Sequence, residues 1–397
     1  MKFRKLNFSE SINEAMILSM KRDKNIICYG LGVDDPKRIF GTTKKLKELF
    51  GSKRVFDVPV SENALTGIGV GSSLNGLRPV MVHSRIDFFL YAMEQLVNNA
   101  AKWSYMFGGV KSIPLTIRLI IGRGWGQGAT HSQSLQSLFL HIPGLKVVMP
   151  SNSYQAKGLL NAAIFDNNPV LYLEHRWLHN TYTHVPKKFY KLSLDQPQVL
   201  KKGKDITIVS MGYMTNEAII SDKILRSYGI QSEIIDMCVM SPLNLTKIFN
   251  SIKKTKHLLV LDTSTSICSL SSEILSQIFR SCFNDLKSKP EILSLPHVPQ
   301  PTSFGLTKNF YNDHIKRLGF EEAAVKIQDL YLGGRKGAAI GAVPDELVDR
   351  VALVGSKARV RDRLGAWKEA AARKHVGTMV VPVSDIETLR FLAEELL

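Results

Sequence analysis

The sequence predicts an α/β protein with two wound, mainly parallel-sheet domains and a mostly helical C-terminal tail. The first part of the chain alternates β-type runs with helical segments, and a second such series begins after the basic, proline-containing stretch 186–204. Strands separated by helices form parallel sheets that are covered on both faces. The composition then changes near residue 314, which marks the tail.

The composition is that of a folded protein with two or three domains. The chain has 397 residues, of which 44% are hydrophobic and 22% charged, so each domain can bury a core. No apolar run reaches the roughly 18 to 20 residues that span a bilayer, and the polar stretch Asn7–Asn13 argues against a secretory signal. The four cysteines are widely spaced and form no CxxC pair, which argues against structural zinc and a disulfide framework. A location in the reducing cytoplasm is therefore expected. The net charge of +17 is scattered, so we expect neither nucleic-acid nor membrane partners.

Hydrophobic patterns predict the elements of the first domain. Thr42–Phe50 is expected to be a short helix with a threonine cap. Apolar residues at helical spacing predict one amphipathic helix over residues 87–103. The expected strands are Asn25–Gly30, Ile113–Gly122, Leu145–Met149 and Pro169–Leu173.

The second series repeats the alternation and predicts a second right-handed wound sheet. Its expected strands are Asp205–Ser210, Gln231–Met237 and His257–Leu261. Its expected helices are Asn216–Tyr228, Leu245–Lys254 and Ser271–Phe283.

The tail differs from the rest of the chain in charge and composition. Residues 1–313 carry 38 Lys and Arg against 23 Asp and Glu, whereas residues 314–397 carry 14 against 12. Lysine dominates before this point and arginine after it, as if two sequences of different origin were joined. Helices are expected at 315–332, 344–350, 357–373 and 384–396, with a strand at 377–382. The predicted domains are therefore 1–185, 186–308 and 309–397.

One group of residues that could take part in catalysis or ligand binding lies before a glycine-rich helix. A strand delivers Ser61 and Glu62 to the start of this helix, where Ser61 can serve as its cap. Glu62 would lie at a sheet end, where α/β proteins bind ligands. It would otherwise be a first-turn carboxylate favoured by the helix dipole. The glycines are spaced GxGxG, which argues against a dinucleotide site.

Two further candidates are His131 and Phe88. His131 follows the glycine-dense loop Gly122–Gly128, a type of loop that often carries function. It is a candidate for proton transfer or for holding a developing anion, and otherwise a capping or core histidine. Phe88 lies in the predicted helix 87–103, where it either stacks on a flat ring or belongs to the core.

Together these groups resemble a known family. The segments VPVSEN, RPVM…FFLYAMEQLVNNAAK, IGRGWGQGATHSQS, HIPGLKVVMPSNSYQAKGLL and DNNPVLYLE occur in this order. They resemble the beta subunit of the first component of pyruvate and other 2-oxo acid dehydrogenases, within the transketolase-like thiamine diphosphate enzymes. GKDITIVSMGYMTNEA, IIDMCVMSPLN and PHVPQPTSFGLTKNFY resemble that subunit's C-terminal domain more loosely. The resemblance covers about residues 5–311.

The resemblance implies a role for each candidate. Glu62 falls where the family activates thiamine diphosphate through the aminopyrimidine ring. Phe88 falls where an aromatic side chain stacks on the pyrimidine, and His131 where a histidine faces the substrate or the lipoyl group. The implied activity is the oxidative decarboxylation of a 2-oxo acid, as in pyruvate dehydrogenase.

The resemblance also implies partners. The family binds the cofactor diphosphate through Mg²⁺ with a GDG motif, and this sequence has none. The chain is therefore expected to supply only the pyrimidine half of the site, and to be inactive without an alpha-type partner that holds Mg²⁺. An α2β2 assembly and a lipoyl-bearing acyltransferase are implied as well. The run His83–Asp87 departs from the usual pyruvate-type sequence, so the resemblance does not establish pyruvate as the substrate. Asp236-Met237-Cys238 and Asp262–Ser266 also depart from the family, and put the assembly geometry in doubt.

The tail from about residue 309 resembles the C-terminal end of luciferase-like, flavin- or deazaflavin-dependent oxidoreductases. That family forms an eight-fold β/α barrel of about 250 residues or more, and a fragment cannot close a barrel. The chain therefore looks like a chimera, and no flavin activity is expected of the tail. The alternatives to a catalytic beta subunit are a luciferase-like oxidoreductase and a non-catalytic partner subunit.

Overall fold

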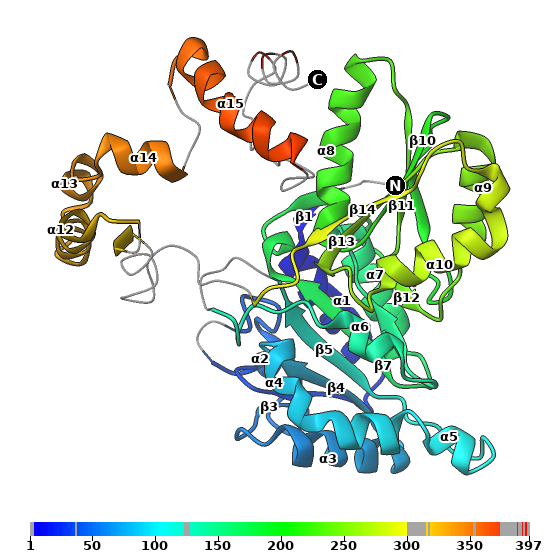
Figure 1. Ribbon diagram of the computed structural model, residues 1–397. Helices are drawn as coiled ribbons and strands as arrows, with labels where there is room; N and C mark the ends of the chain where they lie inside the picture. The colour runs from blue at the N-terminus through cyan, green and yellow to red at the C-terminus, as the bar shows by residue number, and fades with distance from the viewer. Residues whose placement is uncertain are drawn as a thin grey trace. The chain divides into compact units, whose positions relative to one another are not determined.

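The structure is a computed structural model in which the chain forms two compact units, Met1–Ser303 and Phe304–Leu397 (Figure 1). The described residues are 4–35, 38–122, 128–299, 315–316, 318–351 and 355–373, together with 387, 391 and 394. The first unit contains two mainly parallel sheets, as the sequence predicts. The second is helical where it is described.

The first large sheet has seven strands in the order β12-β6-β7-β5-β4-β2-β3. All neighbours are parallel except β12, which pairs antiparallel with β6 although it comes from much later in the chain. The strands are β2 (Ile26–Gly30), β3 (Val55–Asp57), β4 (Arg78–His83), β5 (Thr116–Ile121), β6 (Lys146–Val148), β7 (Val170–His175) and β12 (Val239–Ser241).

Helices cover both faces of this sheet because its strands are apolar on both sides. On β4, Val80 and Val82 pack in the cluster with α1 (Phe8–Arg22) and α7 (Ser153–Ile164), whereas Met81 packs in the cluster with α3 (Glu62–Leu74). Such alternation is the strand period of two. The remaining elements of this half are β1 (Arg4–Asn7), α2 (Leu46–Phe50), α6 (Gln136–Leu140), η3 (Arg176–Leu178) and β8 (Tyr182–Val185), with β1 and β8 forming a small antiparallel sheet.

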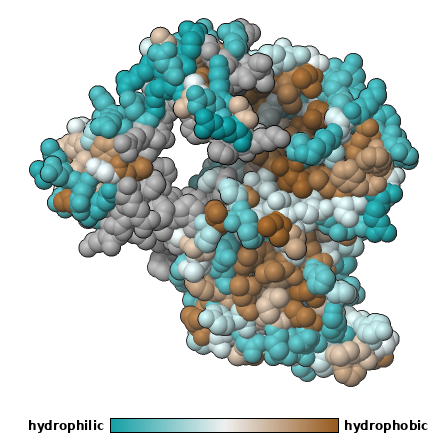
Figure 2. Space-filling model, viewed as in Figure 1, coloured by the Kyte–Doolittle hydropathy of each residue, from teal (hydrophilic) through white to brown (hydrophobic). Residues whose placement is uncertain are grey.

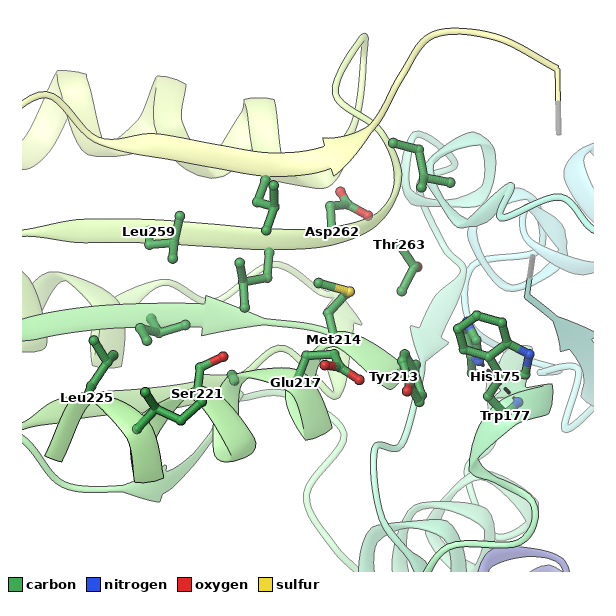
Figure 3. Close-up of a pocket in the computed structure, with 16 residues that line it drawn as sticks. His175, Trp177, Tyr213, Met214, Glu217, Ser221, Leu225, Leu259, Asp262 and Thr263 are labelled. Carbon is green, nitrogen blue, oxygen red and sulfur yellow. Dashed lines mark hydrogen bonds between the residues drawn. The ribbon is translucent and has the colours of Figure 1, made fainter. Parts of the chain in front are cut away.

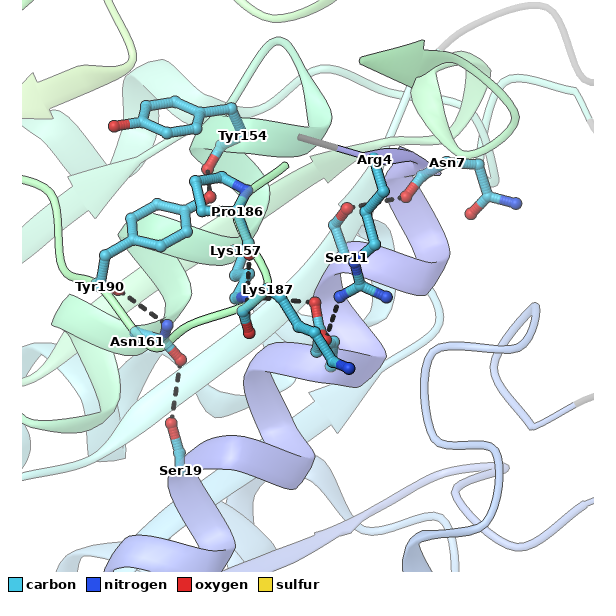
Figure 4. Close-up of polar contacts among 11 residues, drawn as sticks. Arg4, Asn7, Ser11, Ser19, Tyr154, Lys157, Asn161, Pro186, Lys187 and Tyr190 are labelled. Atoms are coloured by element: carbon cyan, nitrogen blue, oxygen red, sulfur yellow. Dashed lines mark hydrogen bonds and ion pairs between the residues drawn. The ribbon is translucent and has the colours of Figure 1, made fainter. Parts of the chain in front are cut away.

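Polar contacts tie α1 to α7 and to the segment that follows β8 (Figure 4). Ser19 Oγ donates to Asn161 Oδ1 at 3.1 Å, and Asn161 Nδ2 donates to the carbonyl of Tyr190 at 2.8 Å. The buried ammonium of Lys157 donates to the carbonyl of Pro186 at 2.6 Å and pairs with Glu14 at 3.1 Å. Burial lowers the pKa of Lys157, so these partners offset the cost of burying a cation.

The second sheet has five strands in the order β14-β13-β10-β11-β9, of which only β9 is antiparallel. Its strands are β9 (Gln198–Lys201), β10 (Ile206–Ser210), β11 (Ser232–Asp236), β13 (Leu258–Thr265) and β14 (Glu291–Leu295). Its helices are α8 (Tyr213–Ser227), α9 (Thr246–Thr255), α10 (Leu270–Cys282) and η4 (Phe283–Asp285). The sequence predicts β10, β11, β13 and all three α-helices within a few residues, but not β9 or β14.

Two helical predictions for the first domain are wrong in detail. The helix expected at Thr42–Phe50 begins only at Leu46, because Thr42 bonds back to the carbonyl of Ile39 and Thr43 to that of Val33. The helix expected over residues 87–103 is continuous but irregular, because its backbone stays right-handed helical at each junction while its hydrogen-bond pattern changes. It consists of α4 (Ile86–Phe89), the 3-10 turn η1 (Leu90–Ala92), the π-helical η2 (Gln95–Ala100) and α5 (Trp103–Met106).

The second unit is a set of short helices where it is described. These are α12 (Glu321–Leu332), α13 (Lys336–Gly341), α14 (Asp345–Val351) and α15 (Lys357–Ala372), of which α13 is not expected from the sequence. The expected strand 377–382 lies outside the described residues, as does the expected helix 384–396 except for 387, 391 and 394. Within the described part of the chain, no helix is long and apolar enough to cross a membrane.

Candidate functional site

Glu62 is the first residue of α3 and is only 7% exposed. It lies at the carboxyl end of the parallel sheet, because α3 leads away from this edge toward the start of β4. The expected Ser61 cap is wrong. Ser61 has φ −163° and ψ 70°, and its hydroxyl makes no capping hydrogen bond. The Ser61 carbonyl accepts the first hydrogen bond of the helix, from Leu65 N at 2.9 Å.

Close packing of α3 on the sheet fixes the position of Glu62. A Cβ on Gly69 would lie 2.6 Å from the Tyr29 hydroxyl, so glycine is needed for this approach. That hydroxyl donates to the carbonyl of Leu65 at 2.9 Å. Thr66 Oγ1 donates to the carbonyl of Glu62 at 2.8 Å and contacts Met81 Sδ at 3.6 Å. The glycine-rich stretch therefore serves helix packing in the structure.

The structure brings Phe88 and His131 together. Their rings meet edge to face, with centroids 5.1 Å apart and an interplanar angle of 86°. The Phe88 side chain is 36% exposed, so the interpretation of Phe88 as a core residue is wrong. His131 is partly exposed, and its Nδ1 shares a hydrogen bond of 2.9 Å with Thr130 Oγ1. Most of the preceding glycine-dense loop, residues 123–127, lies outside the described residues.

A buried carboxylate anchors the loop of His131 to the helix of Phe88. Asp87 Oδ1 accepts from Gln133 N at 3.2 Å and from Gln133 Nε2 at 2.8 Å. Sequence reasoning does not single out this pair. The available signal is an acidic residue on the otherwise apolar α4, because such a buried charge needs a partner.

A second buried polar group, on two adjacent interior strands of the sheet, is also missed by the sequence reasoning. Arg118 on β5 and Glu174 on β7 are fully buried, and Arg118 Nε donates to Glu174 Oε1 at 2.6 Å. His179 Nε2 lies 3.5 Å from the other carboxylate oxygen. Burial alone would raise the pKa of Glu174, but the charge of Arg118 outweighs it and the pKa is lowered.

The described residues of the first unit line several cavities. One of about 390 Å³ borders the loop that carries His131, with Gln133 and Ser134 on one side and Ser264 and Thr265 on the other. Another, of about 640 Å³, is mainly apolar and lies between α8 and the face of β10, β13 and β14. His175, Trp177 and Tyr213 stand at one end of it (Figure 3). Its apolar lining also shows as brown surface beside α8 (Figure 2).

Metal-binding side chains do not cluster in the part of the chain that the structure describes. Among these residues, no three His, Cys, Asp or Glu side chains come together in a way that would hold a metal ion.

Two wound sheets, with a buried carboxylate at the carboxyl edge of the first, define a transketolase-like α/β protein. Residues 4–180 match the transketolase pyrimidine-binding domain and residues 195–327 the transketolase C-terminal domain. The luciferase-like monooxygenase family matches residues 282–374, in agreement with the resemblance of the tail. The two C-terminal matches therefore overlap.

Similar proteins specify the family. The beta subunit of acetoin:2,6-dichlorophenolindophenol oxidoreductase is 38% identical in Cupriavidus necator and 37% in Bacillus subtilis, each over 76% of this chain and 91% of the relative. The beta subunit of the pyruvate dehydrogenase E1 component of Porphyra purpurea is 35% identical over 74% of this chain and 88% of the relative. The chain belongs to this family of transketolase-like beta subunits.

A solved structure supports the fold. It is described as a split-gene transketolase in an inactive beta4 tetramer, and it superposes with a TM-score of 0.59 over 85% of this chain and 98% of that chain. The sequence identity is 20%, so this likeness concerns the fold alone.

Proposed function

We propose that the chain is the cofactor-activating beta subunit of a thiamine diphosphate-dependent oxidoreductase that decarboxylates a 2-oxo acid together with an alpha-type partner. The observation that carries the proposal is the position of Glu62. A carboxylate buried at the first turn of α3, at the carboxyl edge of a parallel sheet, lies where α/β proteins bind ligands. The family of beta subunits provides the context for this role.

The residues present fit the pyrimidine half of the cofactor. Glu62 would hold the aminopyrimidine ring through a hydrogen bond to a ring nitrogen, and the partly exposed ring of Phe88 offers it a flat apolar surface. When bound, thiamine diphosphate supplies the electron sink for the chemistry, and the protein supplies orientation and electrostatics.

His131 is the candidate for handling a proton at the substrate. Thr130 engages its Nδ1 and Phe88 packs against its ring, so both contacts restrict the orientation of the imidazole. Nε2 can then hold or donate a proton at the substrate oxygen. Such general acid–base catalysis is worth roughly 100- to 10,000-fold in rate.

The other half of the site is assigned to a partner. The sequence contains no Gly-Asp-Gly, so the cofactor diphosphate and Mg²⁺ would be held by an alpha-type subunit. We propose an α2β2 assembly that passes its product to a lipoyl-bearing acyltransferase. A dichlorophenolindophenol-type electron acceptor would replace that acyltransferase in an assay.

A second candidate substrate is a hydroxyketone. Two of the similar beta subunits are named for acetoin, at 38% and 37% identity, against 35% for a pyruvate dehydrogenase subunit. Both substrate classes require thiamine diphosphate chemistry at the same site, so Glu62 serves in either case.

The test is dye reduction by the complex reconstituted with an alpha-type partner. Pyruvate, larger 2-oxo acids and acetoin are compared for the wild type, Glu62→Gln and Glu48→Gln, a matched change of an exposed carboxylate on α2. We expect Glu62→Gln to lower kcat by roughly 100-fold or more with every substrate, while Glu48→Gln retains activity. Full activity of Glu62→Gln would contradict the proposal and favour a non-catalytic partner subunit.

A further inference from the structure

His83, the last residue of β4, is buried without a hydrogen-bond partner. Its side chain is 1% exposed, and neither ring nitrogen has a partner among the residues that the structure describes. Its ring meets Phe89 edge to face at 5.1 Å. Burial lowers the pKa of His83 to about 4, so the ring is neutral near pH 7, with one N–H donor and one acceptor unused.

An unused donor and acceptor in the interior call for an explanation, because unpaired buried polar groups are unfavourable and rare. The contrast within the same domain is His179. It is also 1% exposed and its ring nitrogens make no hydrogen bond among the described residues either, but its Nε2 lies 3.5 Å from the carboxylate of Glu174. A phenylalanine would fill the space of His83 without this cost. The imidazole is therefore expected to find its partner in another state of the protein.

His83 lies on the face of β4 that α3 covers, since it contacts Phe89 of the same apolar cluster. The helix runs antiparallel to the strand, and Thr66 contacts Met81 at 3.6 Å. Glu62 lies four residues before Thr66, about 6 Å along the helix axis. His83 lies two residues after Met81 on the same strand face, about 6.6 Å along the strand. The two buried side chains therefore share one level at the carboxyl edge of the sheet.

We propose that His83 is a positioning residue that donates a hydrogen bond from its imidazole N–H to the carboxylate of Glu62 when the cofactor is bound. Its role is to hold this carboxylate in the orientation that the aminopyrimidine ring requires. The inference rests on the proposed function, since it assigns Glu62 to the cofactor. His83 acts through Glu62 and does not itself touch the reacting atoms.

The experiment compares His83→Phe, which removes both polar atoms, with His83→Gln, which retains an N–H donor. His179→Phe is the matched control, because it removes an equally buried histidine whose Nε2 lies 3.5 Å from a carboxylate. The first readout is urea unfolding of the full-length chain alone. We expect His83→Phe to unfold at the same or a higher urea concentration than the wild type, and His179→Phe at a lower one.

The second readout is the binding of thiamine diphosphate with Mg²⁺ to the complex with an alpha-type partner. We expect His83→Phe to raise the Kd for thiamine diphosphate roughly 10- to 100-fold, as for the loss of a hydrogen bond to a charged group. His83→Gln should restore most of the affinity. The KM for the 2-oxo acid should stay unchanged while kcat falls.

Either measurement can overturn the proposed role of His83. If His83→Phe unfolds at lower urea than the wild type, the ring nitrogens are already satisfied within the chain and the inference is overturned. A Kd within twofold of the wild type for His83→Phe overturns it as well. If the wild-type complex binds no cofactor, or if Glu62→Gln is fully active, the proposed function fails first and the role of His83 fails with it.

Discussion

Asp236, at the end of β11, is a fully buried carboxyl group that joins the two sheets of the first unit. Its Oδ2 accepts from Ser151 Oγ at 2.5 Å and from Gln155 Nε2 at 2.8 Å, and its Oδ1 from Thr215 Oγ1 at 3.2 Å. Burial raises the pKa of Asp236 to about 6 despite these bonds. The folded protein therefore holds this proton more tightly than the unfolded chain does.

This shift predicts a pH dependence of stability. Between about pH 4 and pH 6 the unfolded chain releases the proton first, so the free energy of unfolding should fall as the pH rises. Asp236→Asn keeps the neutral form and should remove this fall, which amounts to at most roughly 3 kcal/mol. Urea unfolding of the wild type and of both variants from pH 4 to pH 7 measures it, with the exposed Asp195→Asn as control. If the difference in the free energy of unfolding between the wild type and Asp236→Asn stays the same from pH 4 to pH 7, the prediction is contradicted.

The buried Arg118–Glu174 ion pair gives a second prediction at the scale of single residues. Glu174→Gln leaves the buried guanidinium of Arg118 without its counter-charge, and should lower the free energy of unfolding by about 3–5 kcal/mol. The double variant Arg118→Met with Glu174→Leu replaces both charges by apolar groups and should be less destabilised than the single one. Chemical unfolding of the wild type and of the two variants measures this, and a double variant that is at least as destabilised as Glu174→Gln would contradict the prediction.

At the scale of elements, α3 offers a test within one helix. A Cβ at Gly69 would meet the Tyr29 hydroxyl at 2.6 Å, whereas a Cβ at Gly71 meets nothing within 4 Å. Gly69→Ala should therefore lower the free energy of unfolding by roughly 1–3 kcal/mol through overpacking. Gly71→Ala should raise it by up to about 1 kcal/mol, because alanine favours the helix. Urea unfolding of the chain alone distinguishes them, and equal effects would contradict the packing of α3 described above.

The sequence predicts long, periodic elements better than short ones. The helices α8 and α10 and the buried strand β5 follow from their apolar patterns. β9 and β14 are short edge strands with exposed positions, and β12 has three residues whose partner β6 lies far away in the chain. Such pairings depend on contacts that no local pattern contains. The irregular helix at 86–106 has a continuous apolar pattern, so its changes of hydrogen-bond pattern are equally hidden.

In the candidate site, too, the sequence predicts the individual residues but not the contacts between distant segments. Glu62, Phe88 and His131 are each visible locally, but only as residues with several possible roles. The contact of Phe88 with His131 and the bond from Gln133 to Asp87 join segments more than 40 residues apart. His83 carries no local signal, because a histidine at a strand end is informative only once its ring is seen to lack a partner.

At the scale of the whole molecule, the chain divides into two compact units near residue 303. The family matches overlap between residues 282 and 327, and the composition changes close to residue 314, so the boundary of the expected tail at 309 stays a prediction. We expect a chain ending at Ser303 to unfold at the same midpoint temperature as the first unit does within the full chain. Differential scanning calorimetry measures both. A midpoint lower by more than a few degrees would show that the second unit stabilises the first.

The most direct test of the central claim is the binding of thiamine diphosphate and Mg²⁺ by isothermal titration calorimetry. The chain is titrated alone, together with an alpha-type partner, and as Glu62→Gln with the same partner. A site shared between two subunits predicts binding only in the mixture, weakened in the Glu62→Gln complex. Equally tight binding by the chain alone, or no binding in the wild-type mixture, would contradict it.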